Sequence, residues 1–181
     1  NTGLLIKELR WKENGKAANR IASFIAKDMD SVTNMLRPML SFAHGVSKVI
    51  GYGTMEGITR GLFRISGHRF PLWTRHTPSG ARKLDYTTET PLPGQSEMVY
   101  FPSCITRTMG ASADYDEKAS VTEKTISLLH KAGVAIRYPE NLHRLCCGRA
   151  FSSQGFLKQA TAKEEELNKD LLKATTNVTW R

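Results

Sequence analysis

The chain has 181 residues, of which 40% are hydrophobic and 24% are charged. This composition is typical of a globular protein that is long enough to bury a sizeable core. No apolar run approaches the roughly 20 residues that a membrane-spanning helix needs. The N-terminus has neither an initiator methionine nor a signal-peptide pattern, and the chain is therefore expected to be a segment of a longer protein.

The net charge of +9 is concentrated in the N-terminal half. Between residues 31 and 84 there are eight Lys or Arg residues and one acid, Glu56. This bias is typical of a surface that meets an anionic membrane, an acidic partner domain or nucleic acid, and also of a solvated basic face. Nucleic acid is not expected as a partner, because no recognised binding module accompanies the charge.

The first third of the sequence favours helices. Apolar residues recur at helical spacing over residues 2–13, 17–29 and 54–65, and in a segment that begins at Ser31. Pro38 is expected to kink or end that segment. The stretch 31–66 is basic and amphipathic, so it suits either an anionic membrane surface or packing against a domain outside the fragment. Packing is the preferred interpretation.

The middle of the chain changes character. Residues 68–96 contain Pro71, Pro78, Pro91 and Pro93, which is typical of an irregular linker. Trp73 is expected to anchor this linker on the domain that follows. We therefore predict a helical region over 1–67, a linker over 68–96 and a second domain over 97–181.

The last part of the chain predicts a short α/β unit. Apolar strands are expected over 97–101 and 134–138, and helices over 120–132 and 153–175. The order β-α-β-α predicts two parallel strands joined by a crossover helix.

The three cysteines form the candidate site. An odd number, with two cysteines adjacent, argues against a disulfide framework and for a reducing, cytoplasmic compartment. Cys104 follows the first predicted strand, and Cys146 and Cys147 follow the second. Because the carboxyl ends of parallel strands meet at one edge of a sheet, these thiols are expected to lie close together. The predicted helix after Cys147 would favour thiolates.

Thiolates are soft ligands that select iron–sulfur clusters, zinc or copper(I), and Gly148 lets the backbone approach a bound group closely. Such sites need about four protein ligands. His143 is a candidate for the fourth, although a surface position is the more common one for histidine. The alternative is that the cysteines are ordinary small residues of the core.

Two motifs carry a resemblance to a known family. Residues 99–110 read VYFPSCITRTMG, and residues 146–156 read CCGRAFSSQGF. They resemble the cysteine-rich CCG domain that occurs in heterodisulfide reductases, in the iron–sulfur protein of glycolate oxidase and in anaerobic glycerol-3-phosphate dehydrogenase. They are most similar to the D-lactate dehydrogenases that fuse a flavin domain, a ferredoxin-like domain and a CCG region. Residues 1–10 resemble the segment that follows the ferredoxin-like domain there.

The resemblance implies an α/β fold, with a helical N-terminal region followed by half of a Rossmann-like CCG domain. Residues 97–181 would be the first of two CCG repeats, with Cys104, Cys146 and Cys147 as ligands of an iron–sulfur cluster of the 4Fe-4S type. Gly148 would give the cluster clearance, and Arg149 would tune its potential. The family's next cysteine falls beyond Arg181, so the site is expected to be incomplete within these residues.

The implied function is electron relay in a D-lactate, or other 2-hydroxy-acid, dehydrogenase. FAD in a separate flavin domain would oxidise the substrate, and the electrons would pass to a quinone or cytochrome. The implied location is the cytoplasm or the inner face of the cytoplasmic membrane, with peripheral membrane contact. The iron–sulfur protein of glycolate oxidase, a heterodisulfide-reductase-like protein, and a non-catalytic metal-binding or docking module stay open as alternatives.

Overall fold

The computed structural model describes residues 2–67, 70–112, 117 and 119–176. The chain divides into two compact units that are interleaved along the sequence. The sheet unit consists of Asn1–Val32, Leu84–Cys104 and Thr125–Arg181, and the hairpin unit consists of Thr33–Lys83 and Ile105–Lys124. These limits cut across the ranges 1–67, 68–96 and 97–181, and that division stays a prediction.

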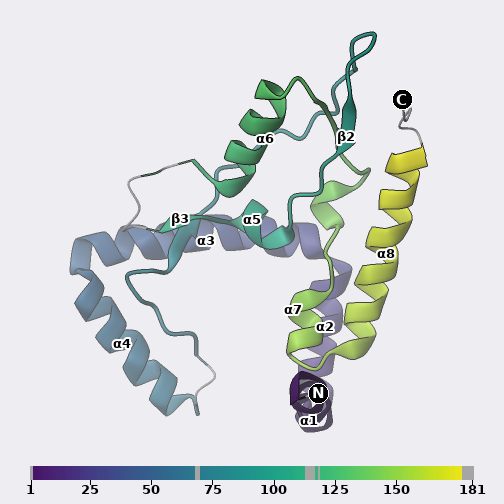
Figure 1. The fold of residues 1–181 in the computed structure, drawn as a ribbon. Helices are drawn as coiled ribbons and strands as arrows, with labels where there is room; N and C mark the ends of the chain where they lie inside the picture. Colours follow the sequence, from purple (N-terminus) through teal and green to yellow (C-terminus); the bar gives the residue numbers. More distant parts are fainter. Residues whose placement is uncertain (1, 68–69, 113–116, 118, 177–181) are drawn as a thin grey trace. The chain divides into compact units, whose positions relative to one another are not determined.

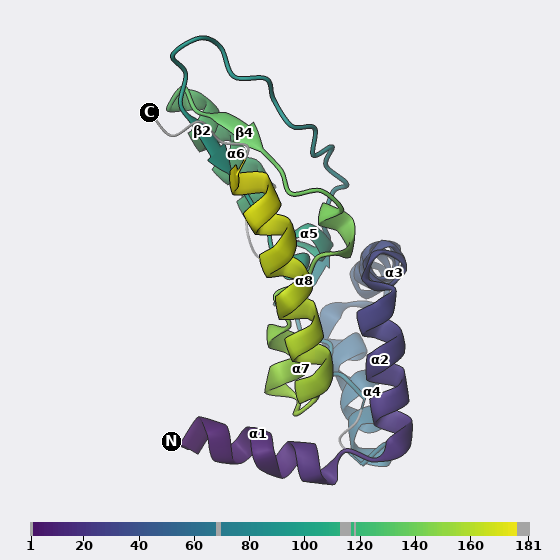
Figure 2. The same ribbon diagram turned by 90° about the vertical axis from the view of Figure 1, so that its right-hand side faces the viewer.

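The sheet unit is built on two parallel strands. Strand β2 (Glu97–Val99) pairs with β4 (Ala135–Arg137), and Met98 lies opposite Ile136. Figure 2 shows the two strands side by side, with α8 (Leu157–Thr176) beginning far from them and running towards them. With α6 (Val121–Lys131) between the strands, the predicted order β-α-β-α and the parallel pairing are confirmed. The sheet has two strands within the described residues, so a Rossmann-like architecture is not established.

A small apolar core surrounds β4. Ile136 is fully buried and lies in one cluster with Tyr138 and Leu142. The Arg137 Nε donates to the Glu97 carboxylate at 2.7 Å, which ties β2 to β4 through a nearly buried ion pair. The side chains that pack around this cluster are Tyr86, Tyr100, Phe101, Ile126 and Leu129.

Part of the predicted linker completes the free edge of β4. The backbone N–H of Glu89 donates to the carbonyl of Ile136 at 2.9 Å, and the Glu89 carboxylate accepts from the N–H of Ile136 at 3.0 Å. The Thr88 hydroxyl accepts from the N–H of Tyr138 at 3.1 Å. An irregular segment thus supplies the partners that a neighbouring strand would give, because buried backbone groups need them.

The N-terminal helices α1 (Thr2–Glu13) and α2 (Lys16–Lys27) also belong to the sheet unit. Helix α2 packs against α8, where Gln159 donates to the Ser23 hydroxyl at 2.9 Å. The end of α1 lies beside the turn after α7 (Arg149–Ser153), as Figure 2 shows, and Asn14 donates to the carbonyl of Gln154 at 2.9 Å.

The helix predicted over 153–175 is wrong at its start. The segment forms two helices, α7 and α8, with a break at Gly155. Gly155 has φ +82°, and a Cβ there would lie 2.5 Å from the backbone N of Trp11. The turn is therefore fixed by a left-handed glycine that α1 approaches closely. A short 3-10 helix, η1 (Leu142–Arg144), lies between β4 and α7.

The hairpin unit combines two helices with an antiparallel strand pair that was not predicted. Helix α3 (Met29–Ile50) begins in the sheet unit, and α4 (Tyr52–Ile65) follows it (Figure 1). Strand β1 (Pro78–Gly80) pairs with β3 (Met109–Ser112), which comes directly after α5 (Cys104–Thr108). No helix of the described residues has both the length and the apolar character to cross a membrane.

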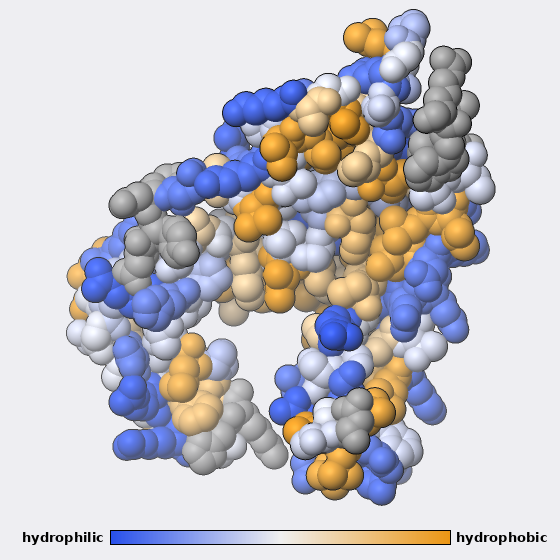
Figure 3. Space-filling model, viewed as in Figure 1, coloured by the Kyte–Doolittle hydropathy of each residue, from blue (hydrophilic) through white to orange (hydrophobic). Residues whose placement is uncertain are grey.

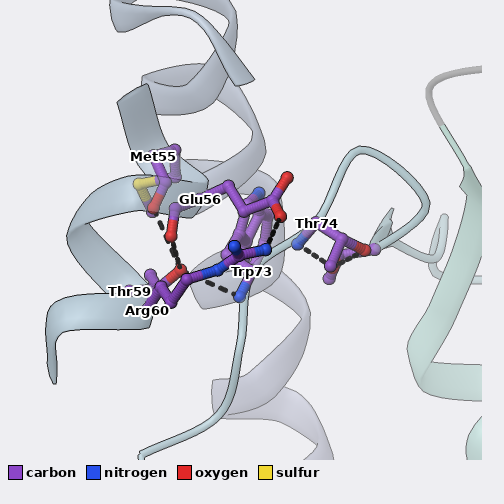
Figure 4. A network of polar contacts seen from close by, with 7 residues as sticks. Met55, Glu56, Thr59, Arg60, Trp73 and Thr74 are labelled. Carbon is purple, nitrogen blue, oxygen red and sulfur yellow. Dashed lines mark hydrogen bonds and ion pairs between the residues drawn. The ribbon is translucent and has the colours of Figure 1, made fainter. Parts of the chain in front are cut away.

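Two expectations concern this unit. Of the kink or end expected at Pro38, the end does not occur, because helix α3 continues through Pro38 to Ile50. Pro38 is exposed, so water can reach the carbonyl that loses its hydrogen bond. The backbone N–H of Trp73 donates to the Thr59 hydroxyl of α4 at 3.1 Å (Figure 4). That hydroxyl donates in turn to the carbonyl of Met55 at 3.0 Å. The expected anchoring of the linker by Trp73 on the following domain stays a prediction.

Candidate thiol site

The structure brings two of the three cysteines into contact. Cys104 is the first residue of α5, shortly after β2, and Cys146 follows η1, after β4. Their Sγ atoms lie 3.6 Å apart, although the residues are 42 positions apart in the sequence. The prediction that the two post-strand loops meet is therefore confirmed, and the parallel pairing of β2 with β4 explains it.

The thiol pair lies in an apolar cluster. Cys146 is 1% exposed, and Cys104 is partly buried against the same group of side chains. The cluster joins α2, α7 and α8 through Ala22, Phe151 and Ala160, with Ile25, Ala26, Met29 and Phe156 packed around them. This environment accounts for the burial of both thiols as core residues, and it also keeps water away from any group that they bind.

The other two predicted ligands, Cys147 and His143, are not part of the contact between Cys104 and Cys146. Cys147 is exposed, and His143 packs its ring against Tyr86 with the ring centroids 5.8 Å apart. Across the described ranges, no three His, Cys, Asp or Glu side chains gather in a group that could hold a metal ion. The structure therefore provides two of the three predicted thiol ligands at one place.

Gly148 has a close backbone approach, which is made to α8. Its φ is +72°, and a Cβ there would lie 2.5 Å from the carbonyl oxygen of Ala160. No other residue type fits both the left-handed backbone and this contact. Gly148 thus lets the Cys146–Cys147 loop lie directly on α8, and its contact with a cofactor stays a prediction. Arg149, the predicted tuning residue, is exposed at the start of α7.

Lys163 is the site residue that sequence reasoning missed. It is only 4% exposed, and its ammonium donates to the carbonyl of Arg144 at 3.0 Å and pairs with the Glu166 carboxylate. Ala160 lies one turn before it on the same buried face of α8. Helix α8 therefore holds the cysteine loop at two points, by an ammonium at Arg144 and by close packing at Gly148.

A signal for Lys163 was present in the sequence. The buried residues of α8 recur at alternating intervals of three and four positions, which is the spacing of one helix face. This buried face of α8 carries three apolar and two charged residues, namely Ala160, Lys163, Leu167, Asp170 and Ala174. The neighbouring run of three glutamates masks this pattern, because it resembles a fully solvated face.

The electrostatic environment keeps the Cys146 thiol protonated. The pKa of Cys146 is raised, first by its hydrogen bond with Cys104 and then by burial. The N–H of Gly148 and the positive charge of Lys163 act in the opposite direction. A neutral Cys146 thiol is therefore expected in the absence of metal, and a bound metal ion would have to displace its proton.

A basic cavity borders the loop that carries the cysteines. It has a volume of about 470 Å³ and lies between α2, α8 and Arg144. Lys27, Lys158 and Lys163 line it together with Arg144, and Glu166 is its one carboxylate. Of these cations, Lys163 acts on Cys146 and lowers the pKa of its thiol.

The thiol pair fits the ligand chemistry of a metal site. Two thiolates at about 2.3 Å from one tetrahedral metal ion lie roughly 3.8 Å apart. The separation of 3.6 Å between Cys104 and Cys146 matches two ligands of one metal ion. The fit therefore holds for these two cysteines as ligands of a single metal ion, while Cys147 faces solvent in the same loop. In a 4Fe-4S cluster each iron takes one cysteine, so the two thiols would have to move apart to hold one.

Comparison of the chain with family models, with curated proteins and with solved structures finds no match.

Proposed function

We propose that this chain is the electron-relay part of an FAD- and iron–sulfur-dependent dehydrogenase that oxidises D-lactate or a similar 2-hydroxy acid. The contact of Cys104 with Cys146 at 3.6 Å carries this proposal. It unites the two motifs of the CCG resemblance at the edge of a parallel sheet, where such folds place ligands. The proposal includes a Rossmann-like CCG domain around β2 and β4.

Cys104 and Cys146 would hold the cluster, with Cys147 as a third ligand and Gly148 beside it. When bound, the cluster supplies a site that accepts and donates single electrons. The apolar cluster around Cys146 excludes water from the pair. The ammonium of Lys163 lowers the cost of the negative charge that the thiolates carry.

The other parts of the reaction lie outside these residues. A flavin domain with FAD would take the hydride from the substrate, and a ferredoxin-like domain would pass the electrons on to this chain. The final acceptor would be a quinone or a cytochrome. The burial of Cys146 and the positive charge of Lys163 near it support a place for the thiol pair in this relay.

Two other interpretations use the same residues. The iron–sulfur protein of a glycolate oxidase or a heterodisulfide-reductase-like protein would use an equivalent thiol site. A non-catalytic metal-binding or docking module is favoured by the exposure of Cys147 and by the apolar surroundings of the other two thiols. Redox behaviour of the bound metal separates this module from the relay.

The test is anaerobic reconstitution with iron and sulfide, on this chain and on the gene product that contains it. We expect bound iron in the gene product, an EPR signal that appears on one-electron reduction, and reoxidation by a soluble quinone. Iron that is bound but never changes redox state would support the docking module. A gene product that binds no iron would contradict the cluster altogether.

A further inference from the structure

The cavity between α2 and α8 gathers positive charge within the sheet unit. The two helices pack side by side (Figure 2), and all the residues that line the cavity belong to this unit. Its volume is about 470 Å³, and the carboxylate of Glu166 faces four cations across it. The net charge of the lining is therefore four minus one, or +3. The four basic residues are Lys27, Arg144, Lys158 and Lys163.

Lys163 brings a buried cation to this cavity. Its side chain is 4% exposed, and an ammonium group has three N–H donors. One donates to the carbonyl of Arg144 at 3.0 Å, and another donates to the carboxylate of Glu166. In the part of the chain that the structure describes, the third donor has no partner. Because buried donors are nearly always paired, an acceptor in the cavity would complete this group.

The other three cations are open to a ligand. Lys27 lies on α2, Lys158 in the first turn of α8 and Arg144 at the end of η1, and all three side chains are exposed. Among the described residues none of them forms an ion pair, since Glu166 is taken by Lys163. Figure 3 shows hydrophilic residues along the part of the molecule that carries α8. Like charges around one cavity repel each other, and a bound anion would remove that repulsion.

The wall of the cavity favours a compact and highly charged ligand. Its only apolar side chains are those of Ala26 and Ala162. The Gln159 amide donates to the Ser23 hydroxyl at 2.9 Å, and that hydroxyl donates to the carbonyl of Asn19 at 2.9 Å. These bonds tie α8 to α2, so the cations of both helices are held around one place. The volume lies in the range of sites for small molecules.

We propose that this cavity binds a small anion that carries phosphate. Lysine and arginine bind phosphate oxygens through charge-assisted hydrogen bonds, and a charge of +3 suits a ligand with two or more negative charges. An acidic protein would also meet Glu164 and Glu165, which are exposed beside Lys163 on α8 and would repel it. A small anion avoids them. The site needs no metal at the thiol pair, so it is independent of the proposed function.

The test is isothermal titration calorimetry of the chain with pyrophosphate, inorganic phosphate and acetate, without divalent metal. We expect pyrophosphate to bind most tightly and acetate most weakly, and the binding to weaken as salt is added. Lys27→Gln and Lys158→Gln should each lower the affinity for pyrophosphate about threefold or more, and together about tenfold or more. The matched controls are Lys16→Gln on α2 and Lys169→Gln on α8. Both remove exposed lysines that do not line the cavity and should leave the affinity unchanged.

Circular dichroism first establishes that each variant keeps its helices. The proposal is overturned if pyrophosphate does not bind, or if the control variants lose as much affinity as the cavity variants, because net charge alone would then explain binding. Polyglutamate that binds where pyrophosphate does not would also overturn it, in favour of an acidic protein partner. Cys104→Ser should leave the affinity for pyrophosphate unchanged, which separates a failure of this site from a failure of the metal site.

Discussion

Gly148 and Gly133 show how one backbone angle serves two purposes. Both have φ +72°, but a Cβ on Gly133 meets no atom within 4 Å, whereas one on Gly148 meets the backbone of Ala160. Gly133 ends α6 as an ordinary left-handed cap. Gly148 adds a close contact that seats the cysteine loop on α8.

This pair of glycines permits a controlled measurement. Gly133→Ala should cost about 1 kcal/mol of unfolding free energy, which is the cost of a left-handed alanine. Gly148→Ala should cost about 1–3 kcal/mol more, because the new methyl group also overlaps α8. Urea denaturation of both variants gives the difference. Equal losses would mean that the loop does not rest on α8 as described.

Lys163 is the second residue that fixes the cysteine loop. Lys163→Gln should lower stability by about 1–3 kcal/mol, because the Glu166 carboxylate and the Arg144 carbonyl lose a charged donor. It should also raise the pKa of Cys146 further, since Lys163 lowers that pKa. The affinity of the thiol pair for Co²⁺ should therefore fall, because metal binding has to displace the proton of Cys146.

Two variants serve as controls for Lys163. Lys163→Arg keeps the charge and should restore part of both effects. Lys169→Gln removes an exposed lysine of the same helix and should change neither stability nor the affinity for Co²⁺. If Lys163→Gln leaves the affinity for Co²⁺ unchanged, the lysine has no electrostatic influence on the thiol pair.

At the scale of elements, β4 depends on a segment that is not a strand. Glu89 serves as its edge partner and also contacts His130 of α6, with 2.6 Å between the carboxylate and the ring nitrogen. One side chain therefore links an irregular segment, a strand and a helix. The hydrogen bond from the N–H of Ile136 is the main cause that lowers the Glu89 pKa, and His130 contributes further.

The lowered pKa predicts how stability depends on pH. A carboxyl whose pKa is lower in the folded state stabilises the fold above its ordinary pKa of 4.5, and the contribution is lost as pH falls through the folded pKa. Glu89→Gln should be less stable than the natural chain at pH 7, and the two should converge under acid. Denaturation midpoints across this pH range test this; a constant difference would contradict it. Glu140→Gln, at an exposed position, is the control.

Helix positions were predictable from local pattern, while their contacts were not. The predicted range 2–13 matches α1, and 120–132 is one residue longer at each end than α6. The break at Gly155 escaped prediction because its cause is α1, which lies far away in the sequence. The burial of the polar face of α3 could not be predicted for the same reason, because contacts with β1 and Arg107 determine which face is covered.

At the scale of the whole molecule, the order of strands was enough to predict that Cys104 and Cys146 meet. Two short strands with a crossover helix between them leave little freedom at their carboxyl edge. The exposure of Cys147 depends on how the cysteine loop packs on α8, which no motif of the sequence encodes. The burial of Lys163 follows from the spacing of one face of α8, but the neighbouring glutamates mask that spacing. The interleaving of the two units likewise follows from contacts between distant segments.

The central claim is that Cys104 and Cys146 act together as a metal-binding thiol pair. Anaerobic titration with Co²⁺ tests it directly, because a thiolate bound to cobalt gives a charge-transfer absorption band that the free ion lacks. We predict this band for the natural chain, and its loss in both Cys104→Ser and Cys146→Ser while circular dichroism shows a retained fold. A band that survives either substitution, or that depends on Cys147 alone, would contradict the claim.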